Sequence, residues 1–382
     1  TLLWAVLFIL LGLFGAPLFA IMGSVAMLAF SAADIDTSAV IVELYRIALN
    51  PSFVAIPLFT FAGYVLAESN SPRRLVNMAR AVFGGIPGGL AVVALLTCAM
   101  FTAFTGASGV TIVALGGLLY PILTQEQYPE KFSLGLVTTS GSLGLLFPPS
   151  LPLILYAVVA QLNIDRLFAG ALLPGILLVL MLSAYGIWTG KKKKVPTTPF
   201  RWEAVWTSLR AAIWEVPLPI IIIGGIYSGL FTATEAAAVT AFYVVIVEVF
   251  IYRDLNLFRD IPRVMRDSML LVGAIFMIIG VAMGLTNYLV DAEVPNALFA
   301  LTQTFISSPV MFLVVLNLFL LIVGMMMDIF SAIIVVVPLI IPIARQYGID
   351  DVHLGVIFLA NLEIGYLTPP VGLNLFISSL RF

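Results

Sequence analysis

Two short polar segments interrupt long apolar runs, and their residue types could bind ions. Thr105–Gly109 combines two hydroxyls with two glycines, and Gly324–Asp328 ends on a carboxylate. Each segment is followed along the chain by a proline pair, Pro148-Pro149 or Pro369-Pro370. Proline has no N–H to donate and clashes with the preceding helical turn, so each pair opens a helix and frees carbonyl oxygens. Carbonyl, hydroxyl and carboxylate oxygens are the ligands that hard cations prefer.

The composition indicates the medium in which these segments lie. Of 382 residues, 62% are hydrophobic and 10% are charged, whereas soluble domains have about 45–50% apolar and about 25% charged residues. A water-soluble enzyme is therefore excluded. The net charge of -2 leaves no basic face for nucleic acid. One cysteine, Cys98, and one histidine, His353, exclude a disulfide framework and a Cys/His zinc site. An integral membrane protein remains.

Long apolar runs predict the helices that hold the polar segments. A spanning helix needs about 20 mostly apolar residues, and the absence of period-2 alternation argues against a barrel. We expect spans at Leu2–Phe30, Phe53–Ala67, Phe132–Ala160, Leu167–Thr189, Val216–Leu230, Thr234–Tyr252, Met269–Val290 and His353–Leu380. We expect helices in the interface plane, with soluble loops as the alternative, at Asp36–Leu49, Pro72–Phe83, Phe200–Glu215 and Leu255–Asp267.

Each polar segment lies between two shorter apolar arms. The arms are Gly88–Phe104 with Val110–Thr124, and Val310–Val323 with Ile329–Ile343. Arms of about 14–17 residues reach only the lower limit for crossing a hydrocarbon core. We therefore predict two re-entrant helical hairpins, with pairs of full spans as the alternative. Backbone exposed at such tips requires surrounding protein or a water-filled cavity.

The order of hairpin and broken helix occurs twice. Gly144–Ser150 carries the break after the first hairpin, and Gly365–Val371 carries the break after the second, about 220 residues later. With the N-terminus in the cytoplasm, all basic residues fall inside except Arg46, Arg166 and Arg345, as the positive-inside rule predicts. The two hairpins then have opposite orientations, and an inverted repeat is typical of secondary transporters.

Five segments resemble the DctM-like large membrane subunit of tripartite ATP-independent periplasmic (TRAP) transporters. They are Phe104–Gly109 with Gly116, Gly117 and Pro121; Leu143–Ile154; Gly229–Val239; Met327–Pro338 with Pro342; and Leu367–Leu375. Two positions depart from the family pattern: Ala233 stands where proline is common, and Glu363 is an unusual charge before the second break. Because of Glu363, the second site of this chain is not expected to match the second site of the family in every residue.

The resemblance implies sodium-driven uptake of an organic acid across the bacterial inner (cytoplasmic) membrane. It implies two partners, a periplasmic substrate-binding protein and a small four-helix membrane subunit that is separate or fused. It also implies a fold similar to that of divalent-anion sodium symporters, in which a hairpin-bearing domain moves like an elevator. The chain begins at Thr1 without a methionine, so we expect it to be trimmed or part of a longer fused chain.

The predicted fold is an all-α polytopic membrane protein of the elevator type. It has an inverted repeat with two re-entrant helical hairpins and two Pro-Pro-broken helices. We expect first-repeat scaffold helices and an interfacial arm in 1–83, the first transport-domain half in 84–160, a connecting span, basic loop and arm helix in 161–215, second-repeat scaffold helices in 216–305 and the second transport-domain half in 306–382.

We expect one sodium ion between each hairpin tip and the break that follows it. The first site would use Gly106, Ser108, Ser140, Gly141 and Phe147, and the second Gly324, Asp328, Leu367 and Thr368. Helix capping is the alternative role for Ser108, Ser331 and Asp328. A carboxylate at bilayer depth costs at least about 2.5–3.5 kcal/mol, so Asp328 is expected to face a cavity or a partner.

The substrate carboxylate would lie at the positive ends of the half-helices. The candidate residues are Thr111, Ser150, Ser331, Thr368 and Asn374, and each has a satisfied core polar group as its alternative role. No arginine lies near either tip, so tight anion capture is expected of the separate binding protein. For Glu363 a protonated, packed side chain is an equal alternative, and Glu235 is expected to cap a helix or contact the scaffold.

Three other classes of function fit the sequence less well. A stand-alone sodium/anion symporter of similar elevator fold is the nearest alternative. An enzyme is not expected because no nucleophile–base pair is visible near His353 or elsewhere. A channel is disfavoured because the duplicated tips lie beside broken helices rather than around a symmetric pore.

Overall fold

The computed structural model describes residues 7–8, 10–12, 14–49, 51–197, 199–306 and 308–382. Every regular element in these ranges is helical. Six of the described helices are long and apolar enough to cross a membrane, or seven spans result if one bent pair counts as a single span. The all-α polytopic membrane fold expected from the sequence is confirmed at this level.

The first part of the chain carries the first polar tip and the first proline break. Its helices are α2 (Leu18–Ala32), α3 (Ser38–Leu49), η1 (Pro51–Val54), α4 (Ala55–Glu68), α5 (Ser71–Phe83), α6 (Gly89–Thr105), α7 (Ser108–Thr111), η2 (Ile112–Gly116), α8 (Gly117–Gln125), α9 (Glu130–Ser140), η3 (Leu143–Leu146), α10 (Leu151–Val159), α11 (Ile164–Lys193) and α12 (Trp202–Ala211). The tip lies between α6 and α7, and the break lies between η3 and α10.

The second part repeats this order. Its helices are α13 (Pro217–Tyr227), α14 (Ala233–Val245), η4 (Ile246–Ile251), α15 (Asp260–Asp291), α16 (Val294–Gln303), α17 (Pro309–Met326), α18 (Ile329–Gln346), α19 (Asp351–Gly365) and α20 (Leu373–Arg381). The second tip joins α17 to α18, and the second break separates α19 from α20. Thr232 and Glu235 form a capping box at the start of α14, as expected for Glu235.

Three expectations about helix boundaries are wrong. A single span over Leu2–Phe30 is interrupted because the chain turns at Gly15, where φ is +84°, and α2 begins after Pro17; the first six residues lie outside the described part. Leu255–Asp267 is not a separate interfacial helix, because most of it continues into the 32-residue α15. The arms α17 and α18 have 18 residues each, which is longer than expected.

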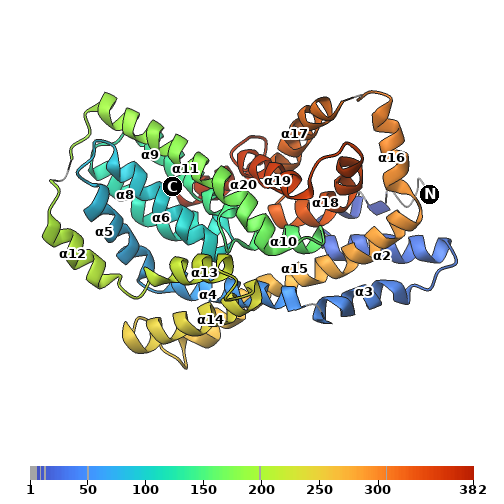
Figure 1. Cartoon of the computed structure of the whole chain (residues 1–382), viewed down its shortest axis with the longest axis horizontal. Coiled ribbons are helices and arrows are strands. Elements are labelled where there is room, and N and C mark those ends of the chain that lie inside the picture. The colour runs from blue at the N-terminus through green and yellow to red at the C-terminus, as the bar shows by residue number, and fades with distance from the viewer. Residues whose placement is uncertain (1–6, 9, 13, 50, 198, 307) are drawn as a thin grey trace.

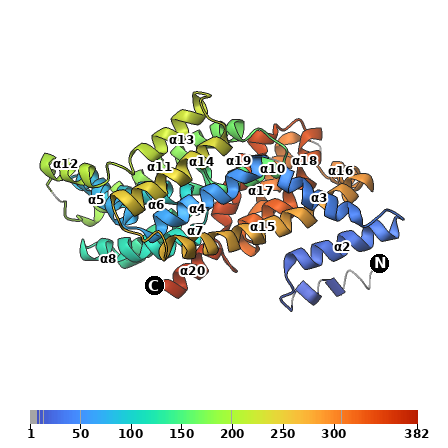
Figure 2. The ribbon, with the colours of Figure 1, turned by 90° about the horizontal axis from the view of Figure 1, so that it is seen from below.

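The helices form two groups that meet along α4 and α15. In one group, α2, α3 and α4 pack on α15 and α14 packs on α4, and these helices make up the lower part of Figure 1. In the other, α6 to α10, α11 and α17 to α20 surround the two tips. Figure 2 shows α12 beside α5 at the far edge of the molecule from α2. Contacts of α4 with α6 and α10, and of α15 with α18, join the groups.

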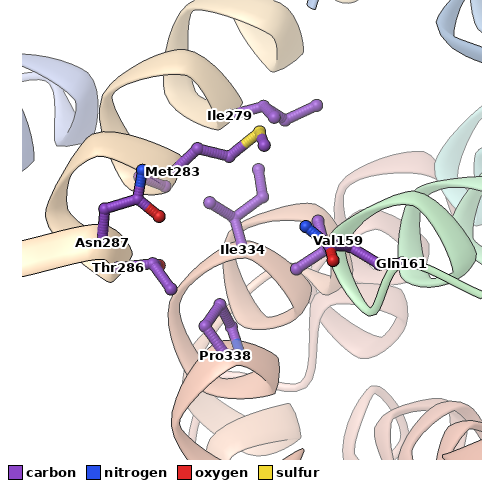
Figure 3. Close-up of a pocket in the computed structure, with 9 residues that line it drawn as sticks. Val159, Gln161, Ile279, Met283, Thr286, Asn287, Ile334 and Pro338 are labelled. Atoms are coloured by element: carbon purple, nitrogen blue, oxygen red, sulfur yellow. The ribbon is translucent and has the colours of Figure 1, made fainter. Parts of the chain in front are cut away.

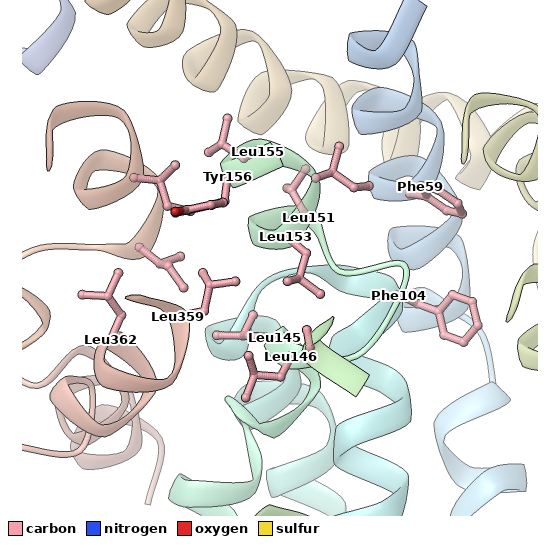
Figure 4. Packing of buried hydrophobic residues seen from close by; sticks show 14 of the residues in the cluster. Phe59, Phe104, Leu145, Leu146, Leu151, Leu153, Leu155, Tyr156, Leu359 and Leu362 are labelled. Carbon is pink, nitrogen blue, oxygen red and sulfur yellow. The ribbon is translucent and has the colours of Figure 1, made fainter. Parts of the chain in front are cut away.

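The two repeats interlock through the helices that follow the breaks. α10 packs on α18 and α19 of the second repeat, whereas α20 packs on α7, η2 and α9 of the first. Figure 4 shows part of the resulting core, where Tyr156 of α10 faces Leu359 and Leu362 of α19. The Tyr156 hydroxyl also donates to the Asp351 carbonyl at 3.2 Å. Each half therefore needs the other to bury its own post-break helix.

A buried ionic cluster fixes α5 to the end of α14. Arg74 of α5 donates to Glu215 at 2.5 Å, to Glu248 at 2.9 Å and to Asp254 at 2.7 Å. Its guanidinium also lies 3.8 Å from the centroid of the Tyr252 ring. Glu215 and Glu248 are almost fully buried. One arginine thus binds segments that come from three distant parts of the chain.

The cluster holds more carboxylates than cations, and burial and hydrogen bonds determine the pKa values of its acids. Burial raises the pKa of Glu215, and the nearby charge of Arg74 only partly opposes this rise. Burial also acts to raise the pKa of Asp254, but hydrogen bonds from Asn70 and Arg74 hold that pKa below its usual range. Removing the cation should therefore cost far more stability than removing one of the acids.

We expect Arg74→Met to lower the free energy of unfolding by about 3–5 kcal/mol, because it leaves buried carboxylates without a cation. Glu215→Gln should cost much less, because it removes part of the excess negative charge. The measurement is the thermal unfolding midpoint of the detergent-purified protein. Arg266→Met is the control, since Arg266 pairs with Asp267 at an exposed position. Equal midpoints for the Arg74 and Arg266 variants would contradict this account.

Candidate functional site

The first tip lies directly against the start of the post-break helix α10. Gly106 ends α6 with φ +64°, and a Cβ added there would lie 2.4 Å from Leu151 Cβ. This backbone conformation strongly favours glycine. The start of the second arm lies near the end of α9, since a Cβ on Gly141 would be 3.3 Å from the Ser108 carbonyl oxygen. The structure therefore places Ser108 next to Gly141, and Gly106 against the start of α10.

One hydroxyl connects the tip to the break. Thr102 Oγ1, fully buried on α6, lies 2.7 Å from Thr111 Oγ1 on the other arm and 2.9 Å from the Gly141 carbonyl oxygen. Its third hydrogen-bond contact is the Cys98 carbonyl at 2.8 Å. The sequence analysis did not name Thr102. Its position one turn before the tip glycine, inside an apolar run, was the signal available.

The first break bends the chain by 44° between the α9–η3 segment and α10. Phe147, before the proline pair, is extended with φ -101° and ψ 135°, as a residue preceding proline should be. Its carbonyl accepts from the Ser150 N–H at 2.9 Å. Ser140 Oγ donates to the Val137 carbonyl at 3.1 Å. A carbonyl oxygen has two lone pairs. The carbonyl oxygens of Phe147 and Gly141 each accept one hydrogen bond, so each has a lone pair left to bind a cation.

At the second tip, Asp328 caps α18. One carboxylate oxygen, Oδ1, accepts from the Phe330 and Ser331 N–H groups, both at 3.0 Å. The Tyr366 hydroxyl accepts from the Ile329 N–H. The capping role that the sequence left open for Asp328 is thus present. Its second carboxylate oxygen is not used by the cap.

The second break packs on this tip through backbone contacts. Gly324 and Gly365 lie so close that a Cβ on Gly365 would be 2.6 Å from Gly324 Cα. The Gly372 N–H donates to the Met325 carbonyl at 3.1 Å. Thr368 Oγ1 donates to the Ile364 carbonyl at 2.8 Å within its own chain segment, and Leu367 is half-buried beside it. Small residues let backbones approach in this way inside membranes.

Three buried side-chain oxygens near the breaks have no hydrogen-bond partner in the described part of the chain. They are Ser150 Oγ, Asn374 Oδ1 and Glu363 Oε1. Ser150 precedes α10, and Asn374 lies in the first turn of α20. The Asn374 side-chain amide donates to the Thr138 carbonyl at 3.4 Å, and Thr138 Oγ1 donates to Ser378 Oγ at 2.8 Å. Unsatisfied buried polar atoms are rare in native proteins and call for a ligand, a water or an ion.

Two other substrate candidates, Thr111 and Ser331, have no buried oxygen without a partner among the described residues. Thr111 is buried against Thr102, so its hydroxyl is satisfied. Ser331 lies half-buried in the first turn of α18. Sequence reasoning missed Tyr366, Thr138 and Ser378, which connect the tips and breaks. Tyr366 could have been found as the polar aromatic residue just before the second proline pair.

Taken together, the tips and breaks place many helix ends in one region. The helices α6, η3, α17 and α19 end there, and α7, α10, α18 and α20 begin there. Helix C-terminal ends present carbonyl oxygens and N-terminal ends present N–H groups. The arrangement can therefore bind a cation through oxygens and an anion through N–H groups. The described residues hold no cluster of three or more His, Cys, Asp or Glu side chains that could bind a metal ion.

A separate small cavity of about 60 Å³, lined by both polar and apolar side chains, lies between α15 and the pair α10–α18. Figure 3 shows Thr286, Asn287 and Met283 on one wall and Gln161, Val159 and Ile334 on the other. This cavity lies where the two groups of helices meet and is distinct from the tips.

Comparison with known proteins gives consistent results. The family model for the DctM component of the tripartite ATP-independent periplasmic transporter matches residues 2–380. The C4-dicarboxylate TRAP transporter large permease protein DctM of Pseudomonas aeruginosa is 38% identical, over 94% of this chain and 83% of that protein. Its counterpart in Rhodobacter capsulatus is 34% identical, over 98% and 88%.

Two further proteins extend the comparison. The isethionate TRAP transporter permease protein DctMQ of Oleidesulfovibrio alaskensis is 35% identical, over 85% of this chain and 52% of that protein. The crystal structure of the YdaH transporter of Alcanivorax borkumensis superposes with a TM-score of 0.58 at 13% identity, over 90% of this chain and 80% of that one. The latter likeness concerns the fold alone.

We expect Gly106→Ala to destabilise the protein by at least about 1–2 kcal/mol, because left-handed backbone is costly for residues with a Cβ and the new methyl group would overlap Leu151. The thermal unfolding midpoint measures this effect. Gly135→Ala is the matched control, since a Cβ there meets nothing within 4 Å. A Gly106 variant as stable as the Gly135 variant would mean that the tip does not pack on α10.

We expect Thr102→Val to cost about 1–3 kcal/mol, because it leaves the Gly141 carbonyl and the Thr111 hydroxyl without this partner. Thr102→Ser should retain most of the stability. Thr60→Val serves as the control, because the buried Thr60 hydroxyl bonds within its own helix, to the Ile56 carbonyl. The free energy of unfolding is measured in urea or by heat, and equal losses for both valine variants would count against the bridging role.

Proposed function

The chain belongs to the DctM component family of tripartite ATP-independent periplasmic transporters, of which it is the large permease component, and from this premise we propose sodium-driven import of an organic acid. The observation that carries the proposal is the packing of both helix-pair tips on proline breaks. The contacts of Gly106 with Leu151, and of Gly324 with Gly365, are its core. Such discontinuous helices provide ion and substrate sites in secondary transporters.

We propose that the first sodium ion binds between the α6–α7 tip and the end of α9. Its ligands would come from the backbone of Gly106, Gly141 and Phe147 and from the hydroxyls of Ser108 and Ser140. Support comes from the close approach of Gly141 to the Ser108 carbonyl oxygen and from the buried Thr102 hydroxyl, which bonds the Gly141 carbonyl. Sodium is a hard cation and prefers such oxygens.

The second sodium ion would bind at the equivalent place, between the α17–α18 tip and the end of α19. Gly324, Leu367 and Thr368 would contribute, and Asp328 would use the carboxylate oxygen that does not cap α18. The supporting observation is again close backbone packing, here between Gly324 and Gly365. Glu363, buried with an unpartnered oxygen, lies near the same helix end.

The substrate carboxylate would bind where α10 and α20 begin. At these helix starts Ser150 offers a buried hydroxyl that has no partner among the described residues and can donate to a carboxylate. The Asn374 side-chain amide has a second N–H besides the one that donates to the Thr138 carbonyl, and Ser331 and Thr111 lie on the second arms. Helix N-termini favour anions because their N–H groups are free. Relatives named for C4-dicarboxylates make a small dicarboxylate the first substrate to test.

The proposed mechanism is an elevator movement of one helix group against the other. The moving unit would contain 84–160 and 306–382, and the scaffold would contain 1–83 and 216–305. The contacts of α2, α3, α4, α14 and α15 support this division, whereas α5 packs on α6 and α16 packs on α18 across it. The helix α11 joins the moving unit because it packs on α6, η3 and α19. The small cavity of Figure 3 lies along this boundary. In this arrangement the tips are re-entrant and the repeat is inverted in the inner membrane.

The proposal includes two partners, a periplasmic substrate-binding protein and a small membrane subunit, separate or fused. The need for these two partners distinguishes the proposed transporter from the second candidate, a stand-alone sodium/anion symporter. The test is uptake of radiolabelled succinate and a panel of other organic acids into proteoliposomes. We expect uptake only with an inward sodium gradient and both partners. Uptake by this chain alone would support the stand-alone symporter, and uptake independent of sodium would overturn the coupling.

We expect Asp328→Asn to keep the helix cap and lose much of the stabilisation by sodium, because asparagine caps about as well as aspartate but carries no charge. Thermal unfolding in sodium chloride is compared with choline chloride at equal ionic strength. A ligand at a hundredfold excess over Kd stabilises by about 2.7 kcal/mol. Asp328→Ala removes the cap as well and so isolates its contribution. An unchanged sodium response in the asparagine variant would restrict Asp328 to capping.

A further inference from the structure

The helix α12 exposes an aromatic and basic face that no other part of the described chain covers. None of its residues is buried, although it packs on α5. Trp202 is 69% exposed and Trp206 is 50% exposed, and they lie one helical turn apart. The Arg210 guanidinium lies 5.2 Å from the centroid of the Trp206 ring. Figures 1 and 2 both show α12 at the edge of the molecule beside α5.

A run of four lysines leads into this face. Lys191–Lys194 end the 30-residue apolar helix α11 and are exposed. The ammonium group of Lys192 lies 4.8 Å from the centroid of the exposed Trp188 ring. Tryptophan next to lysine or arginine at the end of a spanning helix is typical of the lipid headgroup layer. The face and the lysine run therefore lie at the level of the headgroups.

Between α5 and α12 lies a groove that suits a phosphate group. It has a volume of about 420 Å³, and its polar lining comes from Asn77, Arg80, Arg201 and Ser208. Each of these side chains can donate hydrogen bonds. Pro199, on the segment that leads from the lysine run to α12, also lines the groove.

The two arginines that line the groove each lie near a carboxylate, whereas the basic residues around the groove do not. Arg80 pairs with Glu126, and Arg201 lies 3.5 Å from Glu203, where both side chains are largely exposed. Arg210 and the four lysines have no salt bridge among the described residues. The region therefore carries a net positive charge beside an apolar surface. Exposed Val82 and Ile86, at the end of α5 and just after it, extend that surface.

We propose that an anionic phospholipid binds here, with its phosphate between Arg80 and Arg201 and its acyl chains along Val82, Ile86 and Phe200. A soluble anion would use the basic groove but not the apolar surface, and a zwitterionic lipid would use the surface but gain little from the charges. The anionic lipid matches both. Basic clusters next to spanning helices attract such lipids by about 1 kcal/mol for each charge near the surface, which is roughly fivefold in affinity.

The test is binding of dioctanoyl phosphatidylglycerol to the detergent-purified chain, measured by native mass spectrometry. Dioctanoyl phosphatidylcholine and inorganic phosphate are the comparison ligands. We expect phosphatidylglycerol to bind at least tenfold more tightly than either. Equal binding of phosphatidylcholine would overturn the proposal. Phosphate that competes at the same concentrations as phosphatidylglycerol would identify a soluble-anion site instead and would also overturn it.

Two variants locate the site. Arg201→Gln combined with Arg210→Gln, and Lys192→Gln combined with Lys193→Gln, should each weaken phosphatidylglycerol binding by roughly fivefold for every charge removed. Arg166→Gln is the matched control, since Arg166 is exposed at the opposite end of α11. All these residues are exposed, so the fold should be retained. Unchanged lipid binding in both double variants would overturn the proposal.

Discussion

The structure depends on one constraint, which is that backbone polar groups inside a bilayer must be satisfied by protein, ions or enclosed water. Proline pairs and glycine tips break this rule locally by ending helices within apolar runs. The molecule meets the cost by packing each tip on a break, so that Thr102 reaches the Gly141 carbonyl and Gly372 donates to the Met325 carbonyl. The few oxygens left over, such as that of Ser150, are the natural places for a ligand.

Interlocking of the two repeats follows from the same constraint. The helices α10 and α20 begin inside apolar surroundings, and α10, with nine residues, is too short to cross a bilayer. The starts of both helices must therefore be enclosed. Each of them is enclosed by the second arm of the other repeat, α18 in one case and α7 with η2 in the other. The two tips are thereby brought into one unit, which can carry two ion sites and one substrate between them. The Arg74 cluster stabilises a different place, the junction of α5 with the end of α14.

Much of this arrangement could be predicted because prolines, glycines and long apolar runs determine where the helices begin, end and break. The tips, the breaks, the twofold order and the family followed from residues such as Gly106 and Pro148. The turn at Gly15 and the merging of Leu255–Asp267 into α15 could not be predicted from hydrophobic runs, because apolar residues continue through a turn and charged residues continue a helix. The roles of Thr102 and Tyr366 depend on contacts between segments that hydrophobic periodicity does not encode. Asp328 had two possible roles in the sequence, and only its geometry established the cap.

The central claim is that two sodium ions bind where the tips meet the breaks. Equilibrium binding of radiolabelled sodium to the purified chain tests it most directly, since it requires neither substrate nor partner. The account predicts saturable binding of two ions for each chain, displaced by unlabelled sodium but not by potassium. It also predicts that about half of this binding is lost in Asp328→Asn. No saturable binding, or binding that Asp328→Asn leaves whole, would contradict it.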